Sequence, residues 1–249
     1  MTFDIFSVET IVSLLLLSSL LTFLSFFRVF KTRNRKIDKK TLELLTKSVQ
    51  VPDACIPLTS ALNEVSILDD EMECAAQLRS ILQREILLYS TLEQEPELLL
   101  AMSKHVGENE STGALWTRFT VQYNLFAGSI VALGAQFQRE KLYATQKLGE
   151  LGCFAFTECG AGVLSGAAVE TIANYDSKSK QFIIHSPTPS SRKKWISQGL
   201  YAEHAVILAN LMVEDGKKNA GPHLFFVRIQ NRELSGKMTP LPGILLIQC

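Results

Sequence analysis

Two short stretches carry most of the information in this sequence: Gly-Cys-Phe-Ala-Phe-Thr-Glu at residues 152–158, and Lys-Lys-Trp-Ile-Ser at residues 193–197. The first is short and apolar, which is typical of a buried strand. The residues before it, from 38 to 150, instead place apolar side chains at helical spacing. This change of period predicts a boundary between a helical region and a strand region near residue 151.

The region after this boundary, residues 151–249, is predicted to be a β-domain. Strands are expected where Val, Ile, Leu and Phe are enriched, at residues 153–157, 169–175, 181–185, 205–213 and 223–229. The polar run 176–180 predicts a hairpin loop, and Gly216 and Gly221 mark a second turn. Several strands joined by short turns favour an antiparallel sheet or a small barrel.

The region before the boundary, residues 38–150, is predicted to be a helical domain. Helices are expected at residues 42–49, from Asp69 or Asp70 through an apolar stripe that ends at Tyr89, and at residues 97–106, 119–133 and 136–147. A break between two of these helices is expected at residues 107–109, Gly-Glu-Asn. Helices followed by strands make the expected fold class α+β.

The amino terminus, residues 1–37, reads as a transmembrane anchor with a basic flank. Residues 10–27 carry no charge and would span roughly 27 Å as a helix, close to the thickness of a bilayer core. Basic residues crowd the segment 28–40, so the positive-inside rule places the body of the protein in the cytosol. A signal peptide fits less well, because Asp4 and Glu9 stand where basic residues would be expected.

Composition excludes several other classes of protein. Acidic and basic residues balance at 25 each, so no overall field favours nucleic acid. The five cysteines are an odd set without a Cys-x-x-Cys pair, and Cys55, Cys74 and Cys153 are best interpreted as small buried hydrophobes. The four histidines are scattered, so no metal site is assigned.

The two short stretches resemble, in this order, the flavin-contacting elements of the acyl-CoA dehydrogenase and acyl-CoA oxidase superfamily. Residues 125–141 are similar to the end of the family's amino-terminal helical domain, and residues 239–243, Thr-Pro-Leu-Pro-Gly, are similar to a family turn. The series covers residues 125–244 and is closer to the oxidases than to the dehydrogenases. This resemblance implies helices followed by a barrel, with FAD as cofactor.

The resemblance also implies roles for individual residues. Thr157 and Glu158 match a family Thr-Glu pair whose threonine contacts the flavin ring system. Trp195 matches a tryptophan that packs near the flavin, and Ser197 a hydroxyl residue that contacts it. Glu158 is expected to be a structural hydrogen-bonding group rather than a base.

The expected contacts with acyl-CoA are weaker. Ala161 and Gly162 match an Ala-Gly pair of the family, and Ser165 follows shortly after. Val163 and Leu164 stand where the dehydrogenases carry Ser-Asp, which helps to hold the substrate.

The activity implied by the resemblance is FAD-dependent oxidation of fatty acyl-CoA to trans-2-enoyl-CoA, a step of fatty acid β-oxidation. In the family, the carboxylate base comes from a carboxy-terminal helical domain. We expect that domain to be absent from this chain and the β-domain to be truncated, and we assign no catalytic residue. Expected partners are fatty acyl-CoA and either a second copy or a separate carboxy-terminal domain.

Two alternatives stay open at the level of sequence. The chain could be a membrane-anchored, non-catalytic relative that acts as a binding or interaction module. Its location could also be the peroxisome instead of a membrane, although the sequence does not end in the Ser-Lys-Leu address.

Overall fold

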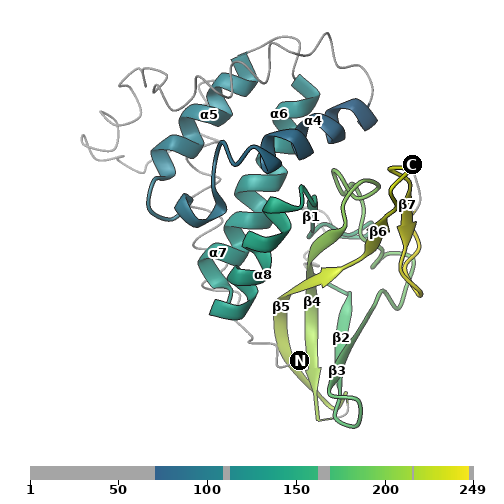
Figure 1. The fold of residues 1–249 in the computed structure, drawn as a ribbon. Coiled ribbons are helices and arrows are strands. Elements are labelled where there is room, and N and C mark those ends of the chain that lie inside the picture. The colour runs from purple at the N-terminus through teal and green to yellow at the C-terminus, as the bar shows by residue number, and fades with distance from the viewer. Residues whose placement is uncertain (1–70, 109–112, 162–168, 215, 247–249) are drawn as a thin grey trace, which may run out of the picture.

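A layer of helices packs beside a twisted β-sheet in the computed structural model, which describes residues 71–108, 113–161, 169–214 and 216–246 (Figure 1). The expected α+β class, helices first and strands second, is confirmed over this part of the chain. Within these residues, no helix is both long and apolar enough to cross a bilayer. The predicted membrane span, residues 10–27, and the predicted helix at residues 42–49 lie outside them.

The first described helix, α4 (Glu71–Gln83), is shorter than the sequence predicts. Its apolar stripe is buried as expected, but the prediction that the helix continues to Tyr89 is wrong. The backbone of Glu85 has a φ of +52°, outside the helical region, so the chain turns away after Gln83. Tyr89 then enters the core from a separate 3-10 turn, η3 (Tyr89–Thr91), where it is fully buried.

The next helices form a near-continuous framework. Helix α5 (Pro96–Glu108) ends within the predicted break at residues 107–109, although Gly107 itself is still helical. A β-carbon added at Gly107 would lie 3.0 Å from the indole of Trp116, closer than an ordinary van der Waals contact, which favours a residue without a side chain. Helix α6 (Gly113–Thr120) continues through a π-helical segment, η5 (Val121–Ala127), into α7 (Gly128–Leu133). The predicted helix 119–133 is therefore part of a longer helical run.

Helix α8 (Gln136–Lys147) has the predicted bounds. The side chain of Gln138 accepts a hydrogen bond from the backbone N–H of Ala135 and so satisfies one of the free donors at the helix start. Together with α7, this helix leads directly to the first strand (Figure 1).

The main sheet is mixed, not antiparallel as predicted. Its strands are β1 (Gly152–Ala155), β2 (Ile172–Asp176), β3 (Gln181–His185), β4 (His204–Val213) and β5 (Lys218–Arg228). β1 pairs in parallel with the first half of β4, and β2 pairs in parallel with its second half. Only β2–β3 and β4–β5 are antiparallel. The long connections 156–171 and 186–203 allow these parallel pairings, which two-residue hairpin turns could not.

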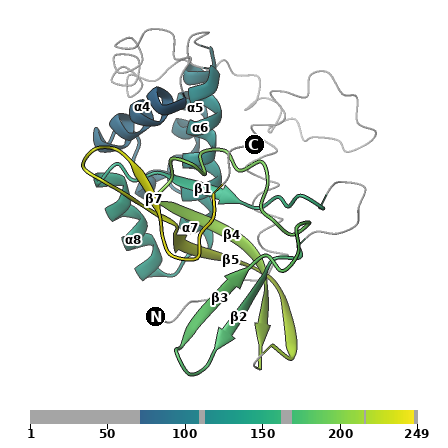
Figure 2. The same ribbon diagram turned by 90° about the vertical axis from the view of Figure 1, so that its right-hand side faces the viewer.

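The β2–β3 hairpin agrees with the sequence, whereas the prediction that Gly221 marks the turn before β5 is wrong, because Gly221 lies within that strand and only Gly216 lies in the turn. The loop 176–180 joins β2 and β3 as predicted, and the carboxylate of Asp176 accepts hydrogen bonds from the Lys178 N–H and the Ser179 hydroxyl. A second, two-stranded sheet is formed by β6 (Gln230–Arg232) and β7 (Met238–Pro240). Figure 2 places the β2–β3 hairpin away from the helices.

The principal core lies between the helices and the near end of the sheet. Phe126 of η5 meets Phe226 of β5 edge to face, with ring centroids 5.7 Å apart. Cys74 and Cys153 are buried in this core, as predicted, and burial raises the pKa of the Cys153 thiol to about 12. Cys55 lies outside the described residues.

Candidate functional site

The two stretches singled out in the sequence lie side by side in the structure. The backbone N–H of Lys194 donates to the Thr157 carbonyl at 3.1 Å, and the Thr157 hydroxyl donates to the Lys194 carbonyl. One residue further on, Glu158 and Lys193 form an isolated antiparallel bridge. Residues that are 37 positions apart in sequence are thereby held as a short two-stranded ladder.

Three of the predicted flavin-contacting residues are exposed on this ladder and the turn that follows it. Thr157 and Ser197 are exposed, and Trp195 has 76% of its surface accessible. The ammonium of Lys194 lies 4.5 Å from the centre of the Trp195 ring, within cation–π range. The exposed indole offers a flat apolar surface, and the exposed residues Thr157 and Ser197 carry hydroxyls on the same ladder and turn.

Glu158, the fourth predicted flavin-contacting residue, points away from that surface. Its buried carboxylate accepts hydrogen bonds from the backbone N–H groups of Glu170 and Thr171 and from the Thr171 hydroxyl. It also forms an ion pair with the Lys193 ammonium at 2.8 Å. Burial by itself would raise the pKa of Glu158, but the hydrogen bonds from Lys193 and Thr171 outweigh it and keep that pKa below its usual value.

Oε1 of Glu158 accepts three of these hydrogen bonds and Oε2 accepts the fourth, so the buried carboxylate acts as a structural tie between distant segments. Glu158 connects the end of β1 with the segment before β2 and with the segment that carries Trp195. The expectation that it is a hydrogen-bonding group and not a base agrees with this geometry.

The three predicted acyl-CoA contacts are only partly described. Ala161 is half-buried, and its backbone N–H donates to the Glu158 carbonyl at 3.2 Å, which closes a tight turn. Gly162 and Ser165 lie outside the described residues. Their contact with acyl-CoA stays a prediction.

Residues that the sequence analysis did not single out support the site from behind. Lys193 and Thr171 donate hydrogen bonds to the Glu158 carboxylate. Gln198 donates to the Gly152 carbonyl and so anchors the turn that carries Trp195. No spacing rule could have found Thr171 or Gln198, because their partners come from distant segments. For Lys193, the only sequence signal was its place in the quoted stretch.

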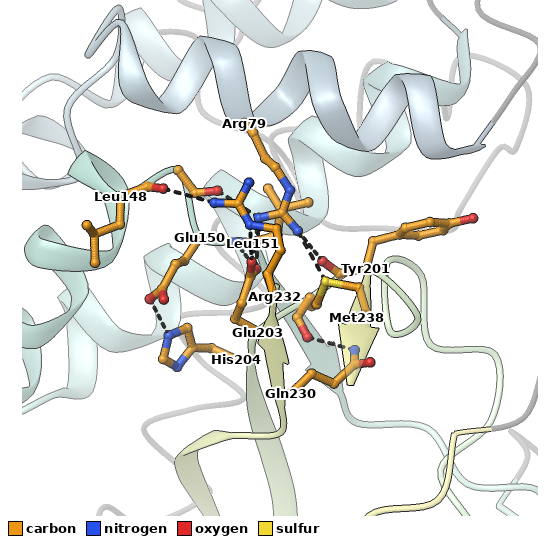
Figure 3. A network of polar contacts seen from close by, with 12 residues as sticks. Arg79, Leu148, Glu150, Leu151, Tyr201, Glu203, His204, Gln230, Arg232 and Met238 are labelled. Carbon is orange, nitrogen blue, oxygen red and sulfur yellow. Dashed lines mark hydrogen bonds and ion pairs between the residues drawn. The ribbon is translucent and has the colours of Figure 1, made fainter. Parts of the chain in front are cut away.

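A buried ionic network lies at the junction of helices and sheet, behind the site. Glu203 is fully buried between the guanidinium groups of Arg79 and Arg232, at 2.7 and 3.1 Å. Figure 3 shows these groups converging with the neighbouring pair His204–Glu150, whose side chains are 2.8 Å apart. The network fixes the orientation of β1 and β4, from whose ends the site is built.

An isoalloxazine ring matches the chemistry of the exposed surface. Its flat aromatic body suits the Trp195 indole, and its polar edge suits the hydroxyls of Thr157 and Ser197. The Thr157 hydroxyl already donates its hydrogen to Lys194, so toward a ligand it offers lone pairs, and donation would require the hydroxyl to rotate.

Comparison with known proteins points to the acyl-CoA oxidases. The chain is 37% identical over 126 residues to the putative peroxisomal acyl-coenzyme A oxidase 1.2 of Arabidopsis thaliana, covering 50% of this chain and 18% of that protein. It is 28% identical over 205 residues to acyl-coenzyme A oxidase 2, peroxisomal, of the same plant, covering 80% of this chain and 28% of that protein. No protein-family model matches the chain.

A solved structure agrees with these matches. The structure of acyl-CoA oxidase-2 of Caenorhabditis elegans, bound with FAD, ascaroside-CoA and ATP, superposes with a TM-score of 0.53 and 25% identity, covering 78% of this chain and 29% of that one. The chain is therefore acyl-CoA oxidase-like over half to 80% of its length. It spans less than a third of the length of these relatives.

Proposed function

We propose that this chain contributes the flavin-contacting β-domain, with part of the adjoining helical domain, to FAD-dependent oxidation of fatty acyl-CoA to trans-2-enoyl-CoA. The observation that carries the proposal is the ladder between Thr157 and Lys194, which brings the two family motifs onto one exposed surface. When bound, FAD would accept the hydride that leaves the acyl chain. The similarity to acyl-CoA oxidases supports the substrate class, a fatty acyl-CoA, and a place in fatty acid β-oxidation.

In this proposal the residues of the chain bind and orient the cofactor. The Trp195 indole packs against the flavin ring, and the hydroxyls of Thr157 and Ser197 bind its polar edge. Glu158 and Lys193 act one layer behind, by holding Thr157 and Trp195 at a fixed separation. No described carboxylate is assigned the role of base, and Glu158 in particular is occupied by its hydrogen bonds.

Location and assembly are also proposals. Both Arabidopsis relatives are described as peroxisomal, which supports the peroxisome as the location of this chain. A second copy, or a separately encoded helical domain, would cover the exposed surface around Trp195 and exclude water from the flavin. Size-exclusion chromatography with and without FAD tests the second copy.

Flavin retention tests the proposed function. The full-length chain is purified, mixed with FAD, desalted, and examined for the visible absorbance of bound flavin. We expect a retained flavin band that is weakened by Trp195→Ala and by Thr157→Val. Phe137→Ala is the matched control, because Phe137 is an exposed aromatic residue on α8, 47% accessible and outside the site.

Either result is informative. A band that is equally strong in Trp195→Ala and in the Phe137→Ala control would contradict the site. The absence of any band from a folded sample would contradict flavin binding by this chain and favour the non-catalytic binding module instead.

A further inference from the structure

The turn that carries the exposed tryptophan has an unusual backbone. Trp195 and Gln198 both have positive φ angles, +29° and +71°, although neither is glycine. Side chains rarely adopt this conformation, and it persists only where the surroundings fix it. These two residues begin and end the turn Trp195-Ile196-Ser197-Gln198, so the surface that presents Trp195 and Ser197 is held in a strained conformation.

The side chain of Gln198 provides the fixing contacts. It is 4% exposed, and its Nε2 donates to the Gly152 carbonyl at 2.7 Å and to the Gln122 Oε1 at 3.0 Å. Gln122 in turn accepts a hydrogen bond from the Gly152 N–H and donates to the Tyr89 hydroxyl. The turn is thus connected both to the first residue of β1 and to the π-helical segment η5.

We propose that Gln198 is a positioning residue: its two buried N–H groups anchor the turn 195–198 so that Trp195 and Ser197 face a ligand in a binding-ready conformation. Gln198 itself points inward and does not touch the ligand. The identity of that ligand as a flavin rests on the proposed function, whereas the anchoring of Trp195 does not.

The anchoring of the turn depends on the N–H groups of the Gln198 side chain. The Oε1 of Gln198 has no hydrogen-bond partner among the described residues, so its acceptor capacity is not used for anchoring. Glutamate has the same size but lacks the N–H groups, and it would place a carboxylate beside two carbonyl oxygens. Glycine would relieve the backbone at φ +71° but would remove the anchor altogether.

The test uses Trp195 as its own reporter. The chain contains two tryptophans, so Trp116→Phe leaves Trp195 as the single one. In this background, fluorescence anisotropy and acrylamide quenching of Trp195 measure the mobility of the turn, and quenching by added FAD measures affinity. The mobility of the turn and the affinity for FAD are measured for Gln198→Glu and for Gln198→Gly. The glycine variant serves as the test if the glutamate variant does not fold.

Gln146→Glu is the matched control. Gln146 is another buried glutamine, 3% exposed, whose Nε2 donates to the Leu87 carbonyl at 2.7 Å within the helical layer. It makes no contact with the turn among the described residues. Its substitution is expected to lower thermal stability without changing the fluorescence of Trp195.

We expect both Gln198 variants to lower the anisotropy of Trp195, to raise its quenching by acrylamide, and to weaken FAD binding about tenfold, because a preorganised site loses affinity when it becomes mobile. Trp195 fluorescence and FAD affinity that match the Gln146→Glu control would overturn the proposal and leave Gln198 a purely structural residue. If the unsubstituted turn binds no FAD, the proposed function fails, and the anisotropy still decides whether Gln198 anchors Trp195.

Discussion

The carboxylate of Glu158 accepts hydrogen bonds from the segment before β2 and from the Lys193 side chain, and almost none of it is accessible to solvent. A buried charge is tolerated only when it is paired and hydrogen-bonded. At the scale of residues, the Glu158–Lys193 pair therefore fixes the positions of the neighbouring residues Thr157 and Trp195.

Removal of the Lys193 ammonium should show how far the folded state depends on this ion pair. Lys193→Met leaves the Glu158 carboxylate buried without its counter-charge, so we expect the free energy of unfolding to fall by about 3 kcal/mol. Urea denaturation measures the change. The double substitution Lys193→Met with Glu158→Gln should recover part of the loss, because the uncompensated charge is gone. Equal stability of Lys193→Met and of Lys178→Met, which changes an exposed lysine, would contradict this assignment.

A second carboxylate predicts a pH dependence. The hydrogen bond from His204, followed by the charges of His204 and Arg228, holds the pKa of Glu150 below its usual value. A depressed pKa in the folded state stabilises the protein above the pKa of the unfolded chain, about 4.3, and this contribution is lost as the pH falls through the folded-state pKa.

Glu150→Gln removes that contribution. The stability difference between the unsubstituted chain and Glu150→Gln, measured by urea denaturation at several acidic pH values, should be larger just above about pH 4.3 than well below it. A difference that grows on acidification would show that the carboxylate is not stabilised in the folded state.

At the scale of elements, the π-helical segment η5 packs directly against β1. A side chain at Gly152 would overlap the ring of Phe126, so only glycine allows β1 to lie against the π-helical segment. π-Helical segments are rare and are frequent at functional sites. Here the segment also carries Gln122, which binds both β1 and the Trp195 turn.

Gly152→Ala tests this contact. We expect it to lower the free energy of unfolding by about 1–3 kcal/mol, because the added methyl must displace the Phe126 ring. Phe126→Leu in combination should relieve part of the loss. Gly128→Ala is the control, since the φ of Gly128 is −57° and its methyl would have room, so stability should be unchanged or higher. Comparable losses in the two glycine variants would contradict the account.

Local sequence signals predicted the elements best where the structure depends on near neighbours. The bounds of α8 and β3 and the hairpin at Asp176 follow from apolar period and turn composition. The end of α4 did not, because Tyr89 continues the apolar stripe but reaches the core from a separate turn. The parallel pairing of β1 and β2 with β4 depends on crossovers between distant segments, which no local pattern encodes.

At the scale of the whole molecule, the ion pair of Arg79 with Glu203 joins helix to sheet. Arg79 also donates to the carbonyls of Gly149 and Tyr201, and Glu203 accepts the Leu151 N–H. One guanidinium thus bonds to both sides of the junction (Figure 3). Neither residue could be selected from the sequence, because the partners are 124 positions apart.

Arg79→Met should destabilise the entire chain. It leaves the fully buried Glu203 with Arg232 as its remaining ionic partner among the described residues, so we expect a loss of about 3 kcal/mol in the free energy of unfolding by urea. Arg79→Lys should lose less but still weaken the junction, because an ammonium cannot reach all three acceptors in the planar geometry of a guanidinium. If Arg79→Met were as stable as the unsubstituted chain, the Arg79–Glu203 ion pair would not be what holds helix and sheet together.

The predicted site could be assembled from sequence only through family resemblance. The motifs around Thr157 and Trp195 matched in order, and the structure places them side by side. The groups that position them, Gln198 above all, were not predictable because their roles depend on a strained backbone and on long-range partners.

The most direct measurement is hydrogen–deuterium exchange of the full-length chain with and without FAD. We expect FAD to protect peptides that cover residues 153–158 and 192–199, with the β2–β3 hairpin unchanged and the protection reduced in Trp195→Ala. Protection elsewhere but absent from these two stretches, or no protection at saturating FAD, would contradict a flavin site on this surface.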